Sequence, residues 1–192
     1  MVDNERRKLK FMRYKLQRFW ETIRYDLPRF IRNLRRFRKA LWHYRTYDPH
    51  GIYVFNHIGL SNMAEYIEKY GLEIDESRLK KVQKMRRAAE LYKNFMEGNF
   101  IDQAEAELGE LIIYPIEFEP SDEHPSYFVM KETENADEKA HNKAVFDRAR
   151  EIEEEQWNEL FDILRGQDYS KFDKEVDWYK QFDGTGLRGW WD

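Results

Sequence analysis

The sequence predicts a mainly α protein: a small domain of five to six helices with a minor two-stranded β ribbon (α+β). Apolar residues recur in steps of three and four along most of the chain, and this spacing places them on one face of a helix. Residues 111–131 differ, because they are rich in β-branched and aromatic residues around a loop. The 192 residues are enough for one buried core, and no long linker divides them. We therefore expect a single domain over residues 1–192.

The first segment, residues 1–48, is a basic helical stretch. We interpret it as two helices, over about 5–26 and 27–44, joined by a kink at Pro28, or as one bent helix. Proline is tolerated in the first turn of a helix, where Asp26 could accept backbone N–H bonds. The apolar stripe expected to face the core contains Leu9, Met12, Leu16, Phe19, Ile23 and Leu27, then Phe30 or Ile31, Leu34, Phe37, Leu41 and Tyr44.

Residues 49–110 form a helical hairpin region in this prediction. Helices are expected over about 52–70 and 76–96, with a short acidic helix from 100 to 108. Asp75 or Ser77 is the expected N-cap of the second helix. In the first helix, the residues expected to face the core are Phe55, Ile58, Met63, Tyr66 and Ile67. Glycine readily adopts the left-handed conformation that often follows a helix, so the helix ends are expected at Gly71, Gly98 and Gly109.

A β ribbon is predicted over residues 111–131. Its strands should cover 111–118 and 127–130, since these runs are β-branched and aromatic, with a loop over 119–126 between them. Proline cannot donate a hydrogen bond to a neighbouring strand, so Pro115 would confine its strand to the edge of a sheet.

The last segments are a long acidic helix over 135–165, ended by Gly166, and an aromatic tail over 166–192. We expect the tail to dock on the core and, specifically, to pack against the basic stretch. Trp190 and Trp191 would otherwise leave two large apolar rings in water at the end of the chain. The C-terminal carboxylates could then meet an arginine of the first helices.

Composition excludes several classes of site. The chain has no cysteine, so it can form neither a disulfide framework nor a thiolate metal site. No apolar run is long enough for a transmembrane segment, and the charged N-terminus lacks the apolar region of a signal peptide. These features lead us to expect a soluble protein of the cytoplasm with no cofactor.

Charge is distributed unevenly along the chain. Residues 1–48 hold 15 Lys or Arg and 5 Asp or Glu, a net charge of +10, whereas the remainder holds 18 and 32, a net charge of −14. One interpretation is that the acidic helices lie against the basic ones, in the same subunit or in a partner copy. The other is that the basic stretch binds an anionic ligand.

The acidic helix carries one constellation that could support catalysis. Glu151, Glu155, Glu159 and Asp162 recur at helical spacing, and carboxylates so arranged can hold Mg²⁺ for cleaving nucleotide phosphates. All-α nucleotide pyrophosphatases use such Glu-x-x-Asp pairs. A solvated acidic face explains the same residues without any metal, and we assign no catalytic or metal-binding residue.

Two weaker patterns are best explained without chemistry. His43, His50 and His57 recur every seven residues, but Pro49 and a glycine interrupt the helix that would align them for a metal. The run from Asp183 to Gly186 is better explained as a turn than as a phosphate-binding loop, because no lysine or helix follows it.

The combination of arginine and aromatic residues in the basic stretch points most directly to a ligand. Guanidinium groups fork onto phosphates, and aromatic faces stack on bases. The residues expected to bind are Arg32, Arg35, Arg36, Trp42 and Arg45. The leading hypothesis is therefore an accessory protein that binds nucleic acid or a phosphorylated nucleotide signal and is not an enzyme. The alternative is a helical module for self-assembly, or for binding a host protein, through the same helices. A Mg²⁺-dependent nucleotide hydrolase is third.

Two segments resemble a family of uncharacterised proteins of tailed bacteriophages that end in Trp-Trp-Asp. They are residues 18–48, with Arg18-Phe19-Trp20, Tyr25-Asp26-Leu27-Pro28 and Trp42-His43-Tyr44-Arg45, and the tail Asp183-Gly-Thr-Gly-Leu-Arg-Gly-Trp-Trp-Asp192. The resemblance implies a phage protein acting in the cytoplasm of an infected host. The family has no assigned activity, so the resemblance implies no site residues. Similar sequences have Trp-Trp-Asp-Tyr where this chain has Thr46-Tyr47-Asp48-Pro49-His50, and we therefore assign no role to Asp48.

Overall fold

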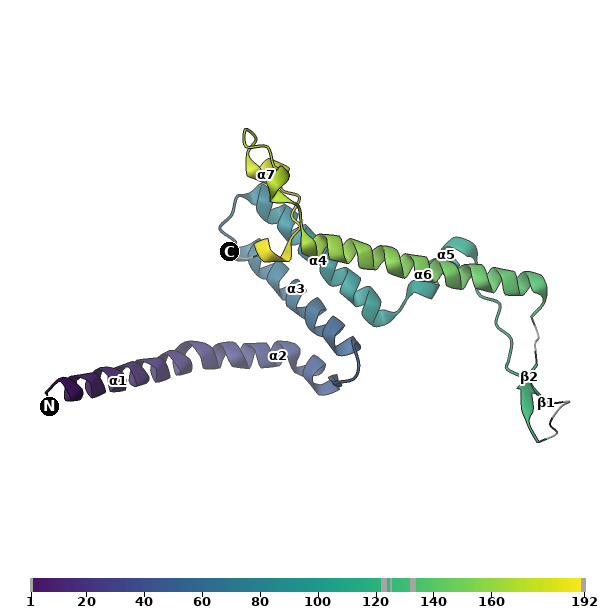
Figure 1. Cartoon of the computed structure of the whole chain (residues 1–192), viewed down its shortest axis with the longest axis horizontal. Coiled ribbons are helices and arrows are strands. Elements are labelled where there is room, and N and C mark those ends of the chain that lie inside the picture. Colours follow the sequence, from purple (N-terminus) through teal and green to yellow (C-terminus); the bar gives the residue numbers. More distant parts are fainter. Residues whose placement is uncertain (1, 122–123, 125, 132–133, 191–192) are drawn as a thin grey trace.

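A long helical arm and a β ribbon extend from opposite ends of a helical body (Figure 1). This computed structural model describes residues 2–121, 124, 126–131 and 134–190. The elements are α1 (Val2–Glu21), a π-helical turn (Thr22–Asp26), α2 (Leu27–His43), α3 (His50–Tyr70), α4 (Asp75–Glu97), α5 (Phe100–Leu108), β1 (Phe118–Pro120), β2 (Phe128–Met130), α6 (Ala136–Arg165) and α7 (Trp178–Gln181). The predicted fold class, mainly α with a two-stranded antiparallel ribbon, is confirmed.

The arm consists of α1, the π-helical turn and α2, and it forms one continuous helix. Pro28 cannot donate a backbone hydrogen bond, and its ring would crowd the carbonyl four residues earlier. The helix widens just before it, where the N–H of Leu27 donates to the carbonyl of Thr22 in an i→i+5 bond. Of the two predicted arrangements, the structure has the single helix. The prediction that Asp26 caps a second helix is wrong, because its side chain accepts no capping bond.

The apolar stripe of the arm does not face a core. Its side chains are exposed along most of the helix, including Phe19, which is 60% exposed. We call this uncovered set the open seam: Met12, Leu16, Phe19, Ile23, Leu27, Phe30 and Leu34. Within its described side chains, the arm packs near its C-terminal end, where Ala40 is buried and Phe37 stacks on Phe55 of α3 with ring centroids 5.6 Å apart. The expected burial of the stripe is therefore wrong over the seam.

The core lies between α3, α4 and α6. Successive turns of these helices contribute apolar residues to it, of which Met85, Leu91 and Leu160 are fully buried. The main cluster contains Leu60, Ala64 and Ile67 of α3, Val82, Met85, Ala88, Ala89 and Leu91 of α4, and Leu160 and Ile163 of α6. A second cluster joins α5 to α6, and Phe95 connects the two because it packs against both.

The helix ends follow the sequence signals in part. Asn135 forms a capping box with Glu138 at the start of α6, and Gly98 adopts the left-handed conformation after α4. Gly71 also follows a helix, but its backbone is not left-handed. Neither Asp75 nor Ser77 is the N-cap of α4; Ile74 occupies that position without a side-chain bond.

The ribbon is shorter than predicted. Phe118 pairs with Met130 and Pro120 with Phe128. The preceding residues run alongside α6 instead of pairing, because Asn142 of α6 bonds both the N–H and the carbonyl of Ile112, at 2.9 Å each. The predicted strand over 111–117 is thus wrong, and Pro115 is not in a strand.

The tail returns to the core through two short 3₁₀ turns and α7. Trp190 is 3% exposed and belongs to the main cluster, together with residues of α3, α4 and α6. The expectation that it packs against the basic stretch is wrong, because that stretch contributes no residue to this cluster. Trp191 and Asp192, which were expected to dock with it, lie outside the described residues.

Candidate anion-binding cleft

The cleft lies between α2 and α3, which diverge from the turn that joins them (Figure 1). The helices pack together near that turn, through Phe37 and Phe55, and farther out long side chains enclose a space of about 520 Å³. Arg29, Arg32 and Arg36 line it from α2, at i, i+3 and i+7 spacing on one helix face. Asn33 is beside them, and α3 contributes Tyr66 and Tyr70 from the opposite wall.

The positive charges on the α2 wall are scarcely neutralised by neighbouring carboxylates. Among the residues that the structure describes, neither Arg32 nor Arg36 pairs with a carboxylate. Arg29 lies 4.0 Å from Asp26, an ion pair on the exposed surface. Like charges one helical turn apart repel, so a bound anion would stabilise this face.

The α3 wall is aromatic. The rings of Tyr66 and Tyr70 lie 5.2 Å apart between centroids, and the ammonium group of Lys69 is 5.1 Å from the Tyr70 ring centroid. Both tyrosines are more than half exposed, so their faces are available to a ligand. Guanidinium groups that fork onto phosphate opposite rings that stack on bases form a site suited to a nucleotide.

The structure divides the predicted site residues. Arg32 and Arg36 line the cleft, whereas Arg35 and Trp42 do not. Trp42 is 85% exposed, and Arg45, in the turn, donates to the hydroxyl of Tyr47 at 3.2 Å.

Sequence reasoning missed four lining residues. Arg29 and Asn33 share the helical spacing of Arg32 and could have been found from it. Tyr66 was predicted to face inward, and Tyr70 was not selected. No sequence signal shows that α3 would present them to α2, because that depends on how the two helices cross.

In the part of the chain that the structure describes, no ion pair joins the acidic helix to the basic arm. Carboxylates of α6 pair with arginines of the body: Arg87 of α4 binds Glu159 through two bonds of 2.8 and 2.7 Å, and Arg148, itself in α6, contacts Glu155 at 3.0 Å and Glu107 of α5 at 2.7 Å. The hydrogen bond from Arg87 lowers the pKa of Glu159. Of the two interpretations of the charge asymmetry, pairing within one subunit is therefore not what the described residues show.

Ion pairs also engage the carboxylates that could hold Mg²⁺. Glu159 is held by Arg87, and Asp162 lies 3.6 Å from Arg165. Over the described ranges, no group of three or more His, Asp or Glu residues is placed to hold a metal. His57 instead bonds the carbonyl of Ala89, at 2.8 Å, and so joins α3 to α4.

Adding millimolar Mg²⁺ or Mn²⁺ is accordingly expected to leave the melting temperature almost unchanged. A metal bound only by the folded chain stabilises it by roughly 2.7 kcal/mol at a hundredfold excess over the dissociation constant. Differential scanning fluorimetry checks this directly. A rise of several degrees that disappears in Glu155→Gln would contradict it and restore the hydrolase hypothesis.

No helix in the described part of the chain is both long enough and apolar enough to cross a membrane. Comparison of the chain with protein-family models, with curated proteins and with solved structures finds no match.

Proposed function

We propose that the cleft between α2 and α3 binds a phosphorylated nucleotide, either free or as one unit of a single-stranded nucleic acid. The observation that carries this proposal is the meeting of Arg29, Arg32 and Arg36 with Tyr66 and Tyr70 around one space of about 520 Å³. The resemblance to tailed-bacteriophage proteins supports a setting in the cytoplasm of an infected host, where the ligand would be a nucleotide signal or nucleic acid.

The α2 wall would bind the phosphate groups of the ligand, and the α3 wall would stack on its base. Each guanidinium group can donate two parallel hydrogen bonds to phosphate oxygens, and such charge-assisted bonds are roughly twice as strong as neutral ones. The tyrosine faces would accept any base, because stacking depends little on base identity. The cleft should therefore select for phosphate charge and tolerate different bases.

Replacing two of the three cleft arginines, in the double variant Arg32→Ala/Arg36→Ala, is expected to weaken nucleotide binding by at least about a hundredfold. Hydrogen bonds to charged groups contribute roughly 1.5–3 kcal/mol each, and two are lost. The matched control is Arg35→Ala/Arg38→Ala, which removes the same charge from exposed positions of the same helix that do not line the cleft. Fluorescence anisotropy with labelled ATP and with a short single-stranded oligonucleotide measures both variants.

The comparison separates a site from a diffuse charge effect. Equal weakening in the two double variants would mean that the whole arm attracts anions, and the cleft proposal would be wrong. A steep fall of oligonucleotide affinity with salt, with little binding of ATP, would assign the cleft to a strand and not to a free nucleotide.

The open seam favours a second function, protein association. Seven large apolar side chains on one face of the arm remain uncovered, and contiguous apolar patches of that kind mark interaction surfaces.

A further inference from the structure

The spacing of the open seam is that of a helix that packs against a helical or grooved partner. Met12, Leu16, Phe19 and Ile23 follow steps of four, three and four, and Leu27, Phe30 and Leu34 continue with three and four. This is the alternation of a coiled-coil core. The single irregular step, from Ile23 to Leu27, coincides with the π-helical turn over Thr22–Asp26.

The π-helical turn keeps the seam on one face. A turn closed by i→i+5 bonds contains more residues than an α turn, so it absorbs the additional residue. The bond from Leu27 N–H to Thr22 carbonyl is that turn's closing bond. The arm thus presents a continuous apolar line, flanked by the charges that give residues 1–48 their net +10.

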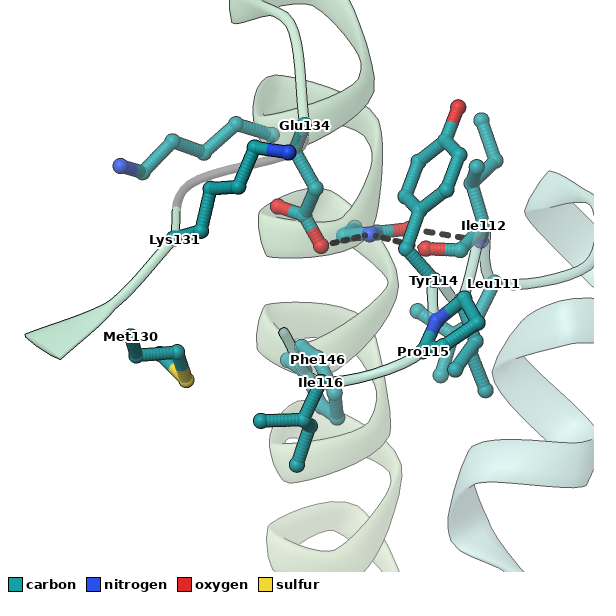
Figure 2. A pocket seen from close by; sticks show the side chains of 12 residues that line it. Leu111, Ile112, Tyr114, Pro115, Ile116, Met130, Lys131, Glu134 and Phe146 are labelled. Carbon is teal, nitrogen blue, oxygen red and sulfur yellow. Dashed lines mark hydrogen bonds between the residues drawn. The ribbon is translucent and has the colours of Figure 1, made fainter. Parts of the chain in front are cut away.

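A second uncovered surface lies at the other end of the molecule. The extended residues 111–116, the end of β2 and α6 enclose a groove of about 480 Å³, which we call the ribbon groove. Figure 2 shows Ile116 and Phe146 on one side of it and Met130 on the other. Its apolar lining is open to solvent, since Ile113 is 81% and Met130 is 63% exposed.

The surroundings of the ribbon groove are acidic. Among the described residues of 110–139, six are Asp or Glu and two are Lys, and both lysines, Lys131 and Lys139, line the groove. Lys131 is already bound by Glu117 at 2.8 Å. Glu134 lines the groove and accepts a bond from Asn142 at 3.1 Å. An apolar floor with an acidic border complements an apolar seam with basic borders.

We infer that the open seam of one copy docks in the ribbon groove of a second copy. The arm cannot reach its own groove, because the two extend from opposite ends of the body (Figure 1). Pairing of two arms would bring two charges of +10 together, whereas arm and groove attract. Reciprocal exchange closes a symmetric dimer, covers both apolar surfaces at once and forms two contacts. This inference does not depend on nucleotide binding by the cleft.

The experiment uses the full chain and two variants with exposed substitutions. The arm variant is Phe19→Glu/Ile23→Glu, and the groove variant is Ile113→Arg/Ile116→Arg, which places positive charge where the arm should bind. Leu79→Glu, at an exposed position of α4, is the control. Sedimentation velocity should show a dimer for the parent and the control. Each double variant should be monomeric, with its dissociation constant raised at least a hundredfold and its circular dichroism melt unchanged.

Mixing the two variants gives the decisive result. The mixture contains intact arms on one chain and intact grooves on the other, so it should form a heterodimer through one contact. A groove variant that stays dimeric would indicate arm–arm pairing and overturn the inference. So would a monomeric parent at every concentration, or a mixture that stays monomeric.

A cross-linking measurement covers the case in which a double variant fails to fold. The chain has no cysteine, so Phe30→Cys and Ile116→Cys in separate copies provide unique thiols. With a flexible bismaleimide, links between the two different copies should exceed links between like copies. Links between two Phe30→Cys copies alone would contradict the inference.

Discussion

Replacing Trp190 with alanine is expected to lower the free energy of unfolding by about 3–5 kcal/mol, the usual cost of truncating a buried aromatic residue. For a chain of this length that corresponds to a fall of roughly 10 °C in the melting temperature. The residue is buried as a member of the main cluster, whose other residues come from α3, α4 and α6, so its loss would leave a cavity in that core. Thermal and urea denaturation measure the effect.

The hydrogen bond of Trp190 adds to its packing. The indole Nε1–H donates to the carbonyl of Gly184 at 2.8 Å in a buried site. Gly184 has a φ of +90°, and a Cβ there would lie 2.3 Å from the Lys80 carbonyl oxygen. The turn thus fits closely against α4, which is why Asp183 is followed by glycine. Its role is structural and not that of a phosphate-binding loop.

Two variants separate the contributions of Trp190. Trp190→Phe retains most of the packing but loses the hydrogen bond, so its destabilisation should be intermediate. Trp178→Ala removes an indole that is half exposed and should cost much less. Equal losses in Trp178→Ala and Trp190→Ala would mean that the tail as a whole, and not the buried ring, stabilises the fold.

The helices of the body could be predicted because their sequence signals are local. Asn135 with Glu138 specifies the start of α6, and Gly98 and Gly109 follow the ends of α4 and α5. A cap or a left-handed glycine acts on its own helix whatever the rest of the chain does. The bounds of these helices therefore followed closely from the residues themselves.

The packing of the arm could not be predicted in the same way. A stripe such as Leu16, Phe19 and Ile23 shows that something apolar covers a helix face, but not whether that cover belongs to the same chain. The strands over 111–118 were overestimated for a related reason. The side chain of Asn142, thirty residues away, bonds the backbone of Ile112, and strand propensity contains no information about it.

The candidate cleft was found only in part, since half of it depends on how two helices cross. Arginine spacing on α2 identified Arg32 and Arg36. In the sequence, Tyr66 falls on the apolar stripe of its helix, as a core residue would. It is exposed because α3 diverges from α2. A ligand site between two helices therefore needs the angle between them as well as the residues on each.

Removing the carboxylate of Glu73 is expected to destabilise the fold by about 3–5 kcal/mol, because it leaves the buried ammonium group of Lys81 without a counter-charge. Lys81 of α4 is 2% exposed, and its ammonium group donates to Glu73 in the loop before that helix. No other hydrogen-bond partner of this ammonium group is present among the described residues. In Glu73→Ala the ammonium would remain buried without a counter-charge.

The reverse change should be far milder, and this asymmetry is the test. Lys81→Met keeps the apolar stem that packs in α4 and removes the charge, while Glu73, at 24% side-chain exposure, can turn to water. The double variant Glu73→Ala/Lys81→Met should recover most of the stability lost in Glu73→Ala, since a buried ion pair replaced by apolar groups is often neutral. Urea denaturation of the three variants gives the coupling free energy. An equal loss of unfolding free energy in Lys81→Met and Glu73→Ala would contradict this expectation. The apolar stem of the lysine, and not the ion pair, would then hold this loop to α4. The penalty for a buried ammonium group without a counter-charge would also be smaller than its burial implies.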